Sequence, residues 1–228
     1  MRKILVIAAH PDDELLGLGG TIRKKVNNGD VAFCLILGEG FTSRGNQRED
    51  ISQEVVNNLH KDAIKASRII GFQEIYFESL PDNRFDSLDL LDVIKIVEKY
   101  VENLKPDIVY THHHGDRNID HKIVYEAVMT GCRPVGEYCV KEIYTFETPS
   151  STEWGFKRKS GIFTPNVFED ITDTLQCKLD AMGCYRSEIR EYPHPRSLRA
   201  LEIIAARWGT VVGREYVEAF DLVRSVRK

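Results

Sequence analysis

Residues 3–14 read KILVIAAHPDDE, and this short stretch decides the expected fold class. Its first part, residues 3–9, is apolar nearly throughout, which is typical of a strand in a parallel sheet that is covered on both faces. The polar run at 10–14 follows directly and leads into a segment with helical periodicity. A buried strand that passes through a polar turn into a helix is the repeating unit of parallel α/β sheets.

The same alternation continues through the first 148 residues. Short runs rich in Ile, Val, Phe and Tyr predict strands at residues 3–9, 31–37, 74–78, 108–111 and 142–146. Helical periodicity between them predicts helices near residues 14–28, 51–70, 88–103 and 119–132. This order predicts an α/β, Rossmann-like three-layer sandwich with a mostly parallel central sheet and right-handed connections.

The pattern weakens in the last third of the chain. We expect a loop or hairpin at residues 149–165, a helix at 172–185, an extended segment at 186–196, a second helix at 197–209, and a final strand or edge at 216–223. The length fits one domain over residues 1–228. Residues 1–148 would form its α/β core and residues 149–228 a C-terminal cap.

Composition excludes several classes of protein. The 228 residues carry a net charge of −4, with 29% charged and 42% hydrophobic residues, which argues against disorder and against a basic nucleic-acid binder. No segment approaches the roughly 18 apolar residues that cross a bilayer, and the five cysteines lack the CxxC spacing of a structural zinc site. We expect a cytoplasmic protein that acts on a small molecule, without nucleic acid or a membrane span, and a homo-oligomer stays possible.

Two polar clusters follow predicted strands directly. AHPDDE, residues 9–14, follows the first strand, and THHHGDRNIDH, residues 111–121, follows the fourth. Ligands bind at the carboxyl ends of strands in open parallel sheets, and the first and fourth strands are neighbours in the common strand orders. We therefore expect the two clusters to face one another.

His10, Asp13 and His121 form a candidate metal site. His10 and Asp13 are three residues apart across a strand-to-helix turn, and His121 would add a second imidazole. Two imidazoles and one carboxylate suit Zn²⁺ with a fourth position open for water, and Asp12 beside them is placed to accept the proton of that water. The competing interpretation of AHPDDE is a helix N-terminus whose acids cap free amides, but the second cluster favours the metal site.

The other polar residues of the second cluster have less specific assignments. Adjacent side chains at a strand end point to different sides, so we expect one of the three histidines at 112–114, His112, to line the substrate pocket. Asp120 either interacts favourably with the dipole of the helix that follows or orients an imidazole. On the second interpretation it belongs with the catalytic residues. Asp116 or Asn118 could cap the helix that follows.

AHPDDE, with the following LGLGGTI (residues 16–22) and the DH that ends the second cluster, resembles the motifs of the LmbE/PIG-L family of zinc-dependent de-N-acetylases. The resemblance extends over most of the chain. It implies one zinc ion per chain held by His10, Asp13 and His121, with Asp12 as the general base. It also implies hydrolysis of the acetamide group of an N-acetylglucosamine-type substrate.

The chain departs from the family pattern at one position. Many members have histidine where this sequence has Asn118, so Asn118 or another histidine must fill that role in contacting substrate or stabilising charge. His194, in the segment YPHPRS (residues 192–197), resembles a late His-Pro segment of some members and is a candidate catalytic acid. The alternative is a surface histidine in a turn flanked by prolines.

Arg44, Asp82 and Arg117 are candidate substrate contacts. Arg44 follows the second strand and could hold a hydroxyl or phosphate group, or be an ordinary solvated arginine. Asp82 follows the third strand and could bind sugar hydroxyls, although a turn aspartate explains it as well. Arg117 could contact the substrate or the oxyanion, and either protonated Asp12 or His194 would protonate the leaving amine.

Two alternatives compete with a hydrolase. A nucleotide-binding protein could use Gly17, Gly19 and Gly20, but their spacing is not GxGxxG, and close packing of the helix on the sheet explains them better. A sugar-binding protein without catalysis would be expected to lack a ligand or the base. All four predicted ligand and base residues are present, which favours an enzyme.

Overall fold

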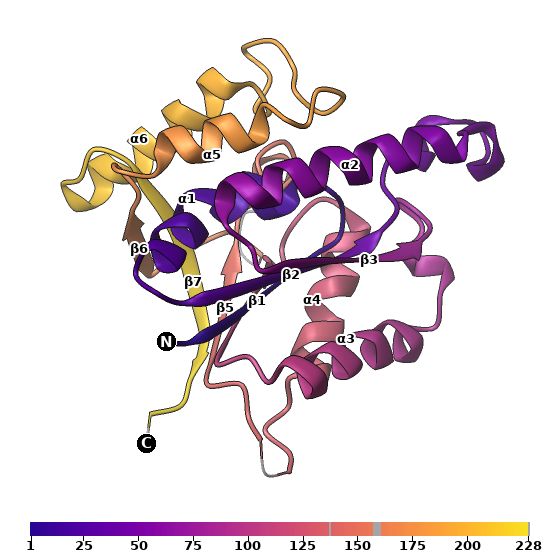
Figure 1. Ribbon diagram of the computed structural model, residues 1–228, viewed down its shortest axis with the longest axis horizontal. Coiled ribbons are helices and arrows are strands. Elements are labelled where there is room, and N and C mark those ends of the chain that lie inside the picture. The colour runs from indigo at the N-terminus through magenta and orange to yellow at the C-terminus, as the bar shows by residue number, and fades with distance from the viewer. Residues whose placement is uncertain (137, 157–160, 228) are drawn as a thin grey trace.

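A computed structural model describes residues 1–136, 138–156 and 161–227. These residues form a seven-stranded sheet with the order β3-β2-β1-β4-β5-β7-β6 (Figure 1). The strands are β1 (Lys3–Ala8), β2 (Val31–Gly38), β3 (Glu74–Leu80), β4 (Ile108–His112), β5 (Glu142–Phe146), β6 (Val167–Asp170) and β7 (Val217–Ser225). The first five strands pair in parallel, and β7 and β6 extend the sheet antiparallel. The predicted fold class is confirmed.

Helices cover both faces of this sheet. The α-helices of the described residues are α1 (Asp13–Asn27), α2 (Gln53–Ile70), α3 (Leu90–Leu104), α4 (Ile119–Gly131), α5 (Leu175–Met182) and α6 (Leu198–Val212). Helices α1, α2, α5 and α6 lie on one side of the sheet, and α3 and α4 lie on the other (Figure 1). Across the described part of the chain, no helix has the length and apolar character needed to cross a membrane.

Strand β1 shows why three layers form. Its side chains alternate between the two faces of the sheet, so that Ile4 and Val6 belong to the core under α1 and α2. Leu5 and Ile7 belong to the core under α3 and α4. Because all residues of the strand after Lys3 are fully buried, the strand must lie in the middle of the sheet.

The C-terminal third of the chain differs in part from its prediction. Residues 149–228 were expected to form a cap, and α5 and α6 do lie over one face of the sheet, but β6 and β7 join the sheet itself. Strand β6 has only four residues, all partly buried, so it is too short to show an alternating pattern. Part of the expected loop or hairpin at 149–165 lies outside the described residues, because positions 157–160 are not described.

Helix α1 lies unusually close to the sheet because it contains glycines. A Cβ atom at Gly17 would come within 2.3 Å of the Phe146 ring, and one at Gly20 within 2.9 Å of Ile171. The helix is also kinked at Leu18, where φ is −151°. These glycines therefore serve close packing of the helix rather than binding of a nucleotide.

At the kink, two backbone amides of α1 donate hydrogen bonds to a buried carboxylate. The Gly20 and Thr21 amides donate to Glu218 of β7 at 3.1 and 2.7 Å. Lys178 of α5 pairs with the same carboxylate at 2.6 Å. Since a buried charge needs both a partner and hydrogen bonds, this network ties the C-terminal elements to the first helix.

Replacing Gly17 by Ala tests the close packing of α1. The added methyl group would overlap the fully buried Phe146 ring, and overpacking of this kind lowers the free energy of unfolding by about 1–3 kcal/mol. Gly19→Ala on the same helix is the control, because the added Cβ atom would lie 3.3 Å from its nearest neighbour, Cγ of Lys178, against 2.3 Å for Gly17→Ala. Urea unfolding should show the larger loss for Gly17→Ala, and equal stability of the two variants would contradict the packing argument.

Candidate active site

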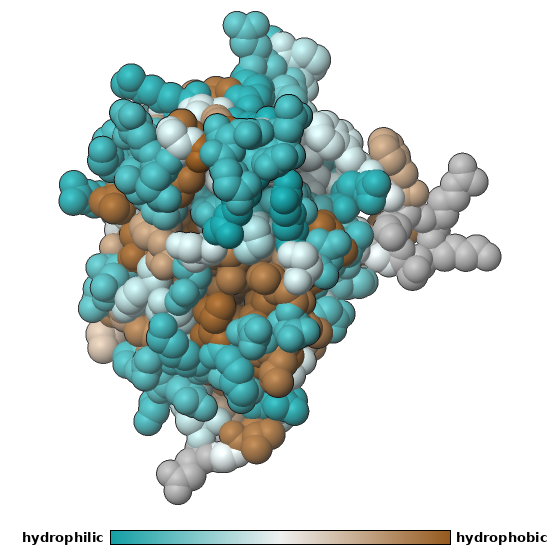
Figure 2. Space-filling view, turned by 90° about the vertical axis from the view of Figure 1, so that its right-hand side faces the viewer, coloured by the Kyte–Doolittle hydropathy of each residue, from teal (hydrophilic) through white to brown (hydrophobic). Residues whose placement is uncertain are grey.

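A polar cleft opens where the carboxyl ends of β1 and β4 meet. These strands are neighbours, with Ile4 paired to Ile108, so the loops that follow them converge as expected. The cleft has a volume of about 220 Å³. Its charged and amide side chains are those of His10, Asp12, Asp13, Arg44, Asp82, Asn83, Asn118, His121, Glu188 and Arg196. Figure 2 views the molecule from the side to which the β3 arrowhead points, where hydrophilic side chains surround a hydrophobic centre.

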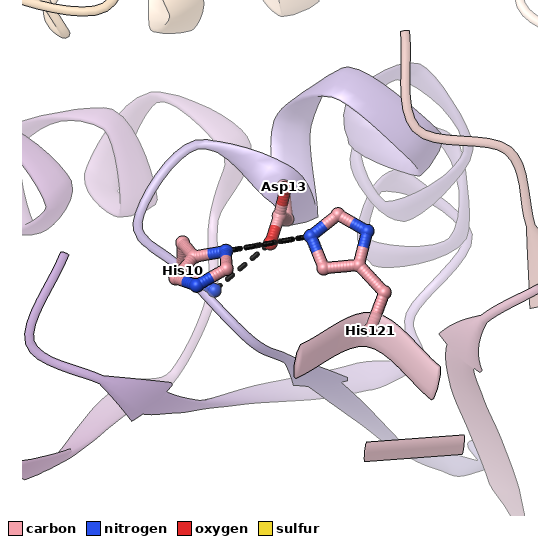
Figure 3. Close-up of side chains that lie close together, drawn as sticks. All are labelled: His10, Asp13 and His121. Carbon is pink, nitrogen blue, oxygen red and sulfur yellow. Dashed lines mark hydrogen bonds and ion pairs between the residues drawn. The ribbon is translucent and has the colours of Figure 1, made fainter. Parts of the chain in front are cut away.

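His10, Asp13 and His121 point toward one another inside this cleft (Figure 3). His10 Nδ1 lies 3.4 Å from Asp13 Oδ2, His121 Nε2 lies 3.3 Å from the same oxygen, and the two ring nitrogens are 3.3 Å apart. Zn²⁺ binds such atoms at about 2.0–2.1 Å in a tetrahedron, whose edges are then about 3.3–3.4 Å. The three donor atoms therefore form a triangle of the size of one face of a zinc tetrahedron.

Buried carboxylates hold the outer nitrogens of both imidazoles. His10 Nε2 lies 2.9 Å from Asp120 Oδ2, and His121 Nδ1 lies 3.2 Å from Asp116 Oδ1. Asp120 also accepts the backbone amides of Asn83 and Phe85, at 2.6 and 3.0 Å, so its carboxylate is fixed. Carboxylates in this position orient imidazole ligands and make them better donors, which corresponds to the second of the two interpretations of Asp120.

A second set of donors, His10 with Asp82 and Asp120, is also close enough to hold a metal ion. Its carboxylates already accept hydrogen bonds, however. Asp82 Oδ2 accepts the amide and hydroxyl of Ser43 at 3.0 and 2.7 Å, and Asp120 accepts two backbone amides. In the set with His121, Asp13 Oδ2 accepts one backbone amide, that of His10 at 2.8 Å, but the set offers two imidazole nitrogens and one carboxylate, which suits zinc better.

The carboxylates around the two rings favour positive charge. Burial alone would lower the pKa of His121, but the Asp13 carboxylate and the contact with Asp116 raise it to about 9. Burial would raise the pKa of Asp13, but His121 and His112 lower it well below its ordinary value. Asp13 is therefore ionised and able to bind a cation at neutral pH.

Asp12 has a strained backbone at the entrance to α1. Its φ is 107°, in the left-handed region that residues with a Cβ atom rarely adopt, at a cost of about 1–3 kcal/mol. Burial and the charges of Asp13 and Glu188 raise the pKa of its carboxyl group well above the ordinary value, while Arg196 opposes that rise. A buried carboxylate with a raised pKa, beside a metal site, is suited to general base catalysis.

Comparison with known proteins decides the family. The sequence profile described as PIG-L, GlcNAc-PI de-N-acetylase, matches residues 5–132, which is more than half of the chain. The chain belongs to the PIG-L family. The matched region contains the whole donor triangle together with Asp12, and the family resemblance predicted from the sequence is confirmed.

Two relatives similar over most of the chain agree with this membership, and a solved structure shares the fold. The uncharacterized deacetylase YaiS of Escherichia coli K12 is 30% identical over 192 residues, which cover 82% of this chain and 91% of YaiS. The diacetylchitobiose deacetylase of Thermococcus kodakarensis is 27% identical over 235 residues, covering 99% of this chain and 85% of the relative. The structure of GalB, a 4-carboxy-2-hydroxymuconate hydratase of Pseudomonas putida KT2440, has the same fold, with a TM-score of 0.74 and 21% identity over 100% of this chain and 98% of GalB.

Three predicted site residues of this PIG-L protein are not among the described residues that line the cleft. The His112 ring is fully buried behind His121 and stacks on it, with centroids 3.9 Å apart. Arg117 is exposed in the turn before α4. His194 is absent from the described lining residues, because its Nδ1 accepts the Arg196 amide at 3.1 Å within the proline-flanked turn.

The remaining predicted contacts do lie in the cleft. Asn118 caps α4 by accepting the Asp120 amide at 2.8 Å, and its side chain also faces the cleft. Asp82 mainly holds the loop that carries Ser43. Arg44 pairs with Glu188 at 2.5 Å and stacks on Phe41, so it is a cleft residue and not a freely solvated arginine.

Two charged residues of the cleft were not among the predicted site residues. Arg196 Nη1 lies 3.2 Å from Asp12 Oδ2 and 2.8 Å from Glu188 Oε2. Both residues come from the segment between α5 and α6, which has no periodic pattern. The sequence signal for Arg196 was the YPHPRS segment, in which the histidine was the predicted site residue and not the arginine two positions later.

Replacing Asp120 by Asn tests its role behind His10. The variant removes the charge that orients the imidazole, so zinc affinity should fall about 10- to 100-fold. Competition with a chromophoric chelator measures that affinity. Asp86→Asn, at an exposed position of the loop after β3 that carries Asn83 and Phe85, should bind zinc as the wild type does. Unchanged affinity of Asp120→Asn would show that the contact with His10 does not support a metal site.

Proposed function

We propose that this PIG-L protein is a zinc-dependent hydrolase that removes the acetyl group from an N-acetylglucosamine-type sugar or sugar conjugate. The observation that carries the proposal is the donor triangle of His10, Asp13 and His121, with the buried carboxylate of Asp12 beside it. The family description and the deacetylase names of two relatives support the choice of reaction.

The donor set fits zinc better than the hard cations. Two imidazole nitrogens and one carboxylate oxygen are typical of catalytic zinc sites that keep one position open, whereas Mg²⁺ and Ca²⁺ prefer oxygen ligands throughout. A zinc ion held there would lower the pKa of a water molecule and polarise the acetamide carbonyl. His10, Asp13 and His121 would hold this ion, one per chain.

Asp12 would move the protons of the reaction. As a general base it would accept a proton from the attacking water, whose oxygen forms the new bond to the acetamide carbon. When the carbon–nitrogen bond breaks, Asp12 would return that proton to the amine, so that acetate and the free amino sugar leave. Because His194 is not among the described residues that line the cleft, we assign both proton transfers to Asp12.

Polar side chains that line the same cleft as the donor triangle would bind the sugar. Asn118 and Arg44 both face the cleft, and each presents N–H groups that suit hydroxyl oxygens of a sugar ring. Asn118 stands where many family members have histidine, so we propose that its amide replaces that imidazole in contacting the substrate.

Metal content tests the ligand assignment. Wild-type protein should bind about one zinc ion per chain. His121→Ala should lose it, because the variant keeps only two of the three protein ligands that a catalytic zinc site has. Elemental analysis after dialysis measures the ratio, with Asp86→Asn as the control. Full zinc retention by His121→Ala would place the metal elsewhere.

Acetate release tests the reaction. Asp12→Asn should keep zinc yet lower kcat by about 10²–10⁴-fold, as loss of a general base does. The substrate panel should include N-acetylglucosamine, diacetylchitobiose and N-acetylglucosaminyl malate. If zinc-loaded wild type releases no acetate from any N-acetyl sugar, the proposed reaction is wrong; a hydration reaction, as named for GalB, would give that result.

A further inference from the structure

Asp12 needs support from outside its own segment. Its backbone is in the left-handed region, with φ of 107°, which is strained because the residue is not a glycine. Its side chain makes no cap hydrogen bond to α1. A strained residue of this kind persists only where neighbouring groups hold it. Two such groups are present, and both come from the C-terminal part of the chain.

Tyr185 holds the backbone of Asp12 through Glu14. The Tyr185 hydroxyl donates to Glu14 Oε1 at 2.6 Å, and Glu14 Oε2 accepts the Asp12 amide at 3.0 Å. Tyr185 is fully buried, and Glu14 is 1% exposed. Burial and the neighbouring Glu14 charge raise the pKa of Tyr185 well above its ordinary value, so the phenol stays protonated and donates.

Arg196 holds the side chain of the same residue. Its Nη1 donates to Asp12 Oδ2 at 3.2 Å and to Glu188 Oε2 at 2.8 Å. Glu188 is also paired with Arg44 of the loop after β2, at 2.5 Å. The guanidinium is thereby fixed from two sides, and it restricts the rotation of the Asp12 carboxylate.

We propose that Tyr185 and Arg196 are positioning residues, which keep Asp12 in the orientation needed to accept a proton. This inference rests on the proposed function, because Asp12 is the general base only in that reaction. Neither residue belongs to the region of the family profile, which ends at residue 132. The C-terminal segment would therefore raise the rate of the reaction by positioning Asp12, without supplying a metal ligand.

Four variants test the proposal in the zinc-loaded protein. Tyr185→Phe removes only the hydroxyl group, and Arg196→Met removes the charge with little change in length. Tyr216→Phe, whose hydroxyl donates to the exposed Glu202 of α6, and Arg186→Met, at an exposed position, are the matched controls. We expect kcat to fall about 10- to 100-fold in the first two, as misplacement of a catalytic group does, with KM and zinc content near wild type.

Two further measurements separate positioning from general damage. Arg196→Lys should recover part of the lost kcat, because it restores the positive charge. In an Asp12→Asn background, Arg196→Met should lower the residual rate less than about twofold, since residues that act through one group are not additive. A full further loss in that background, or a raised KM with unchanged kcat, would make Arg196 a substrate contact and overturn the proposal.

Hydrogen exchange tests the same proposal without any substrate. In Tyr185→Phe the Asp12 amide should exchange at least about tenfold faster, because Glu14 loses its partner, while amides of α3 should be unchanged. If wild type releases no acetate, the proposed reaction fails but this measurement still decides whether Tyr185 holds Asp12. An active wild type with unchanged exchange and unchanged kcat in both variants would refute the positioning role alone.

Discussion

The parallel pairing of β1 with β4 is the constraint on which the site depends. His10 and His121 are separated by 111 residues, yet the pairing places the ends of their strands side by side. Each strand is buried on both faces and is therefore held in register by its neighbours. The positions of the donor atoms are thus set by buried strands in the middle of the sheet, which favours a preformed site over one assembled by the ligand.

The fold and the centre of the site were predictable because they depend on local patterns. The buried run at 3–9 indicated a central strand, and the strand-helix alternation indicated which strand ends meet. His10, Asp13 and His121 follow from that topology with ordinary ligand chemistry. The role of Asp120 stayed open, because choosing between a helix dipole and an imidazole required the distance to His10.

The rest of the site depends on long-range contacts that leave no periodic signal. Arg196 reaches Asp12 across 184 residues, from a segment without helix or strand. His194 was predicted as a catalytic acid because imidazole is a common acid, but its Nδ1 accepts the Arg196 backbone amide within its own turn. Strand β6 was missed for a related reason, since four partly buried residues give no pattern to read.

The contacts of His112 fix the charge of the ring that lies next to the candidate metal site. Its Nε2 accepts the Ala9 amide at 2.9 Å, so the hydrogen of the ring must be on Nδ1, facing Thr148. Burial and the nearby His121 lower its pKa to about 3. The His112 ring, which stacks on His121, is therefore uncharged over the whole physiological pH range. It covers one face of the His121 ring without adding a charge that would repel a cation bound there.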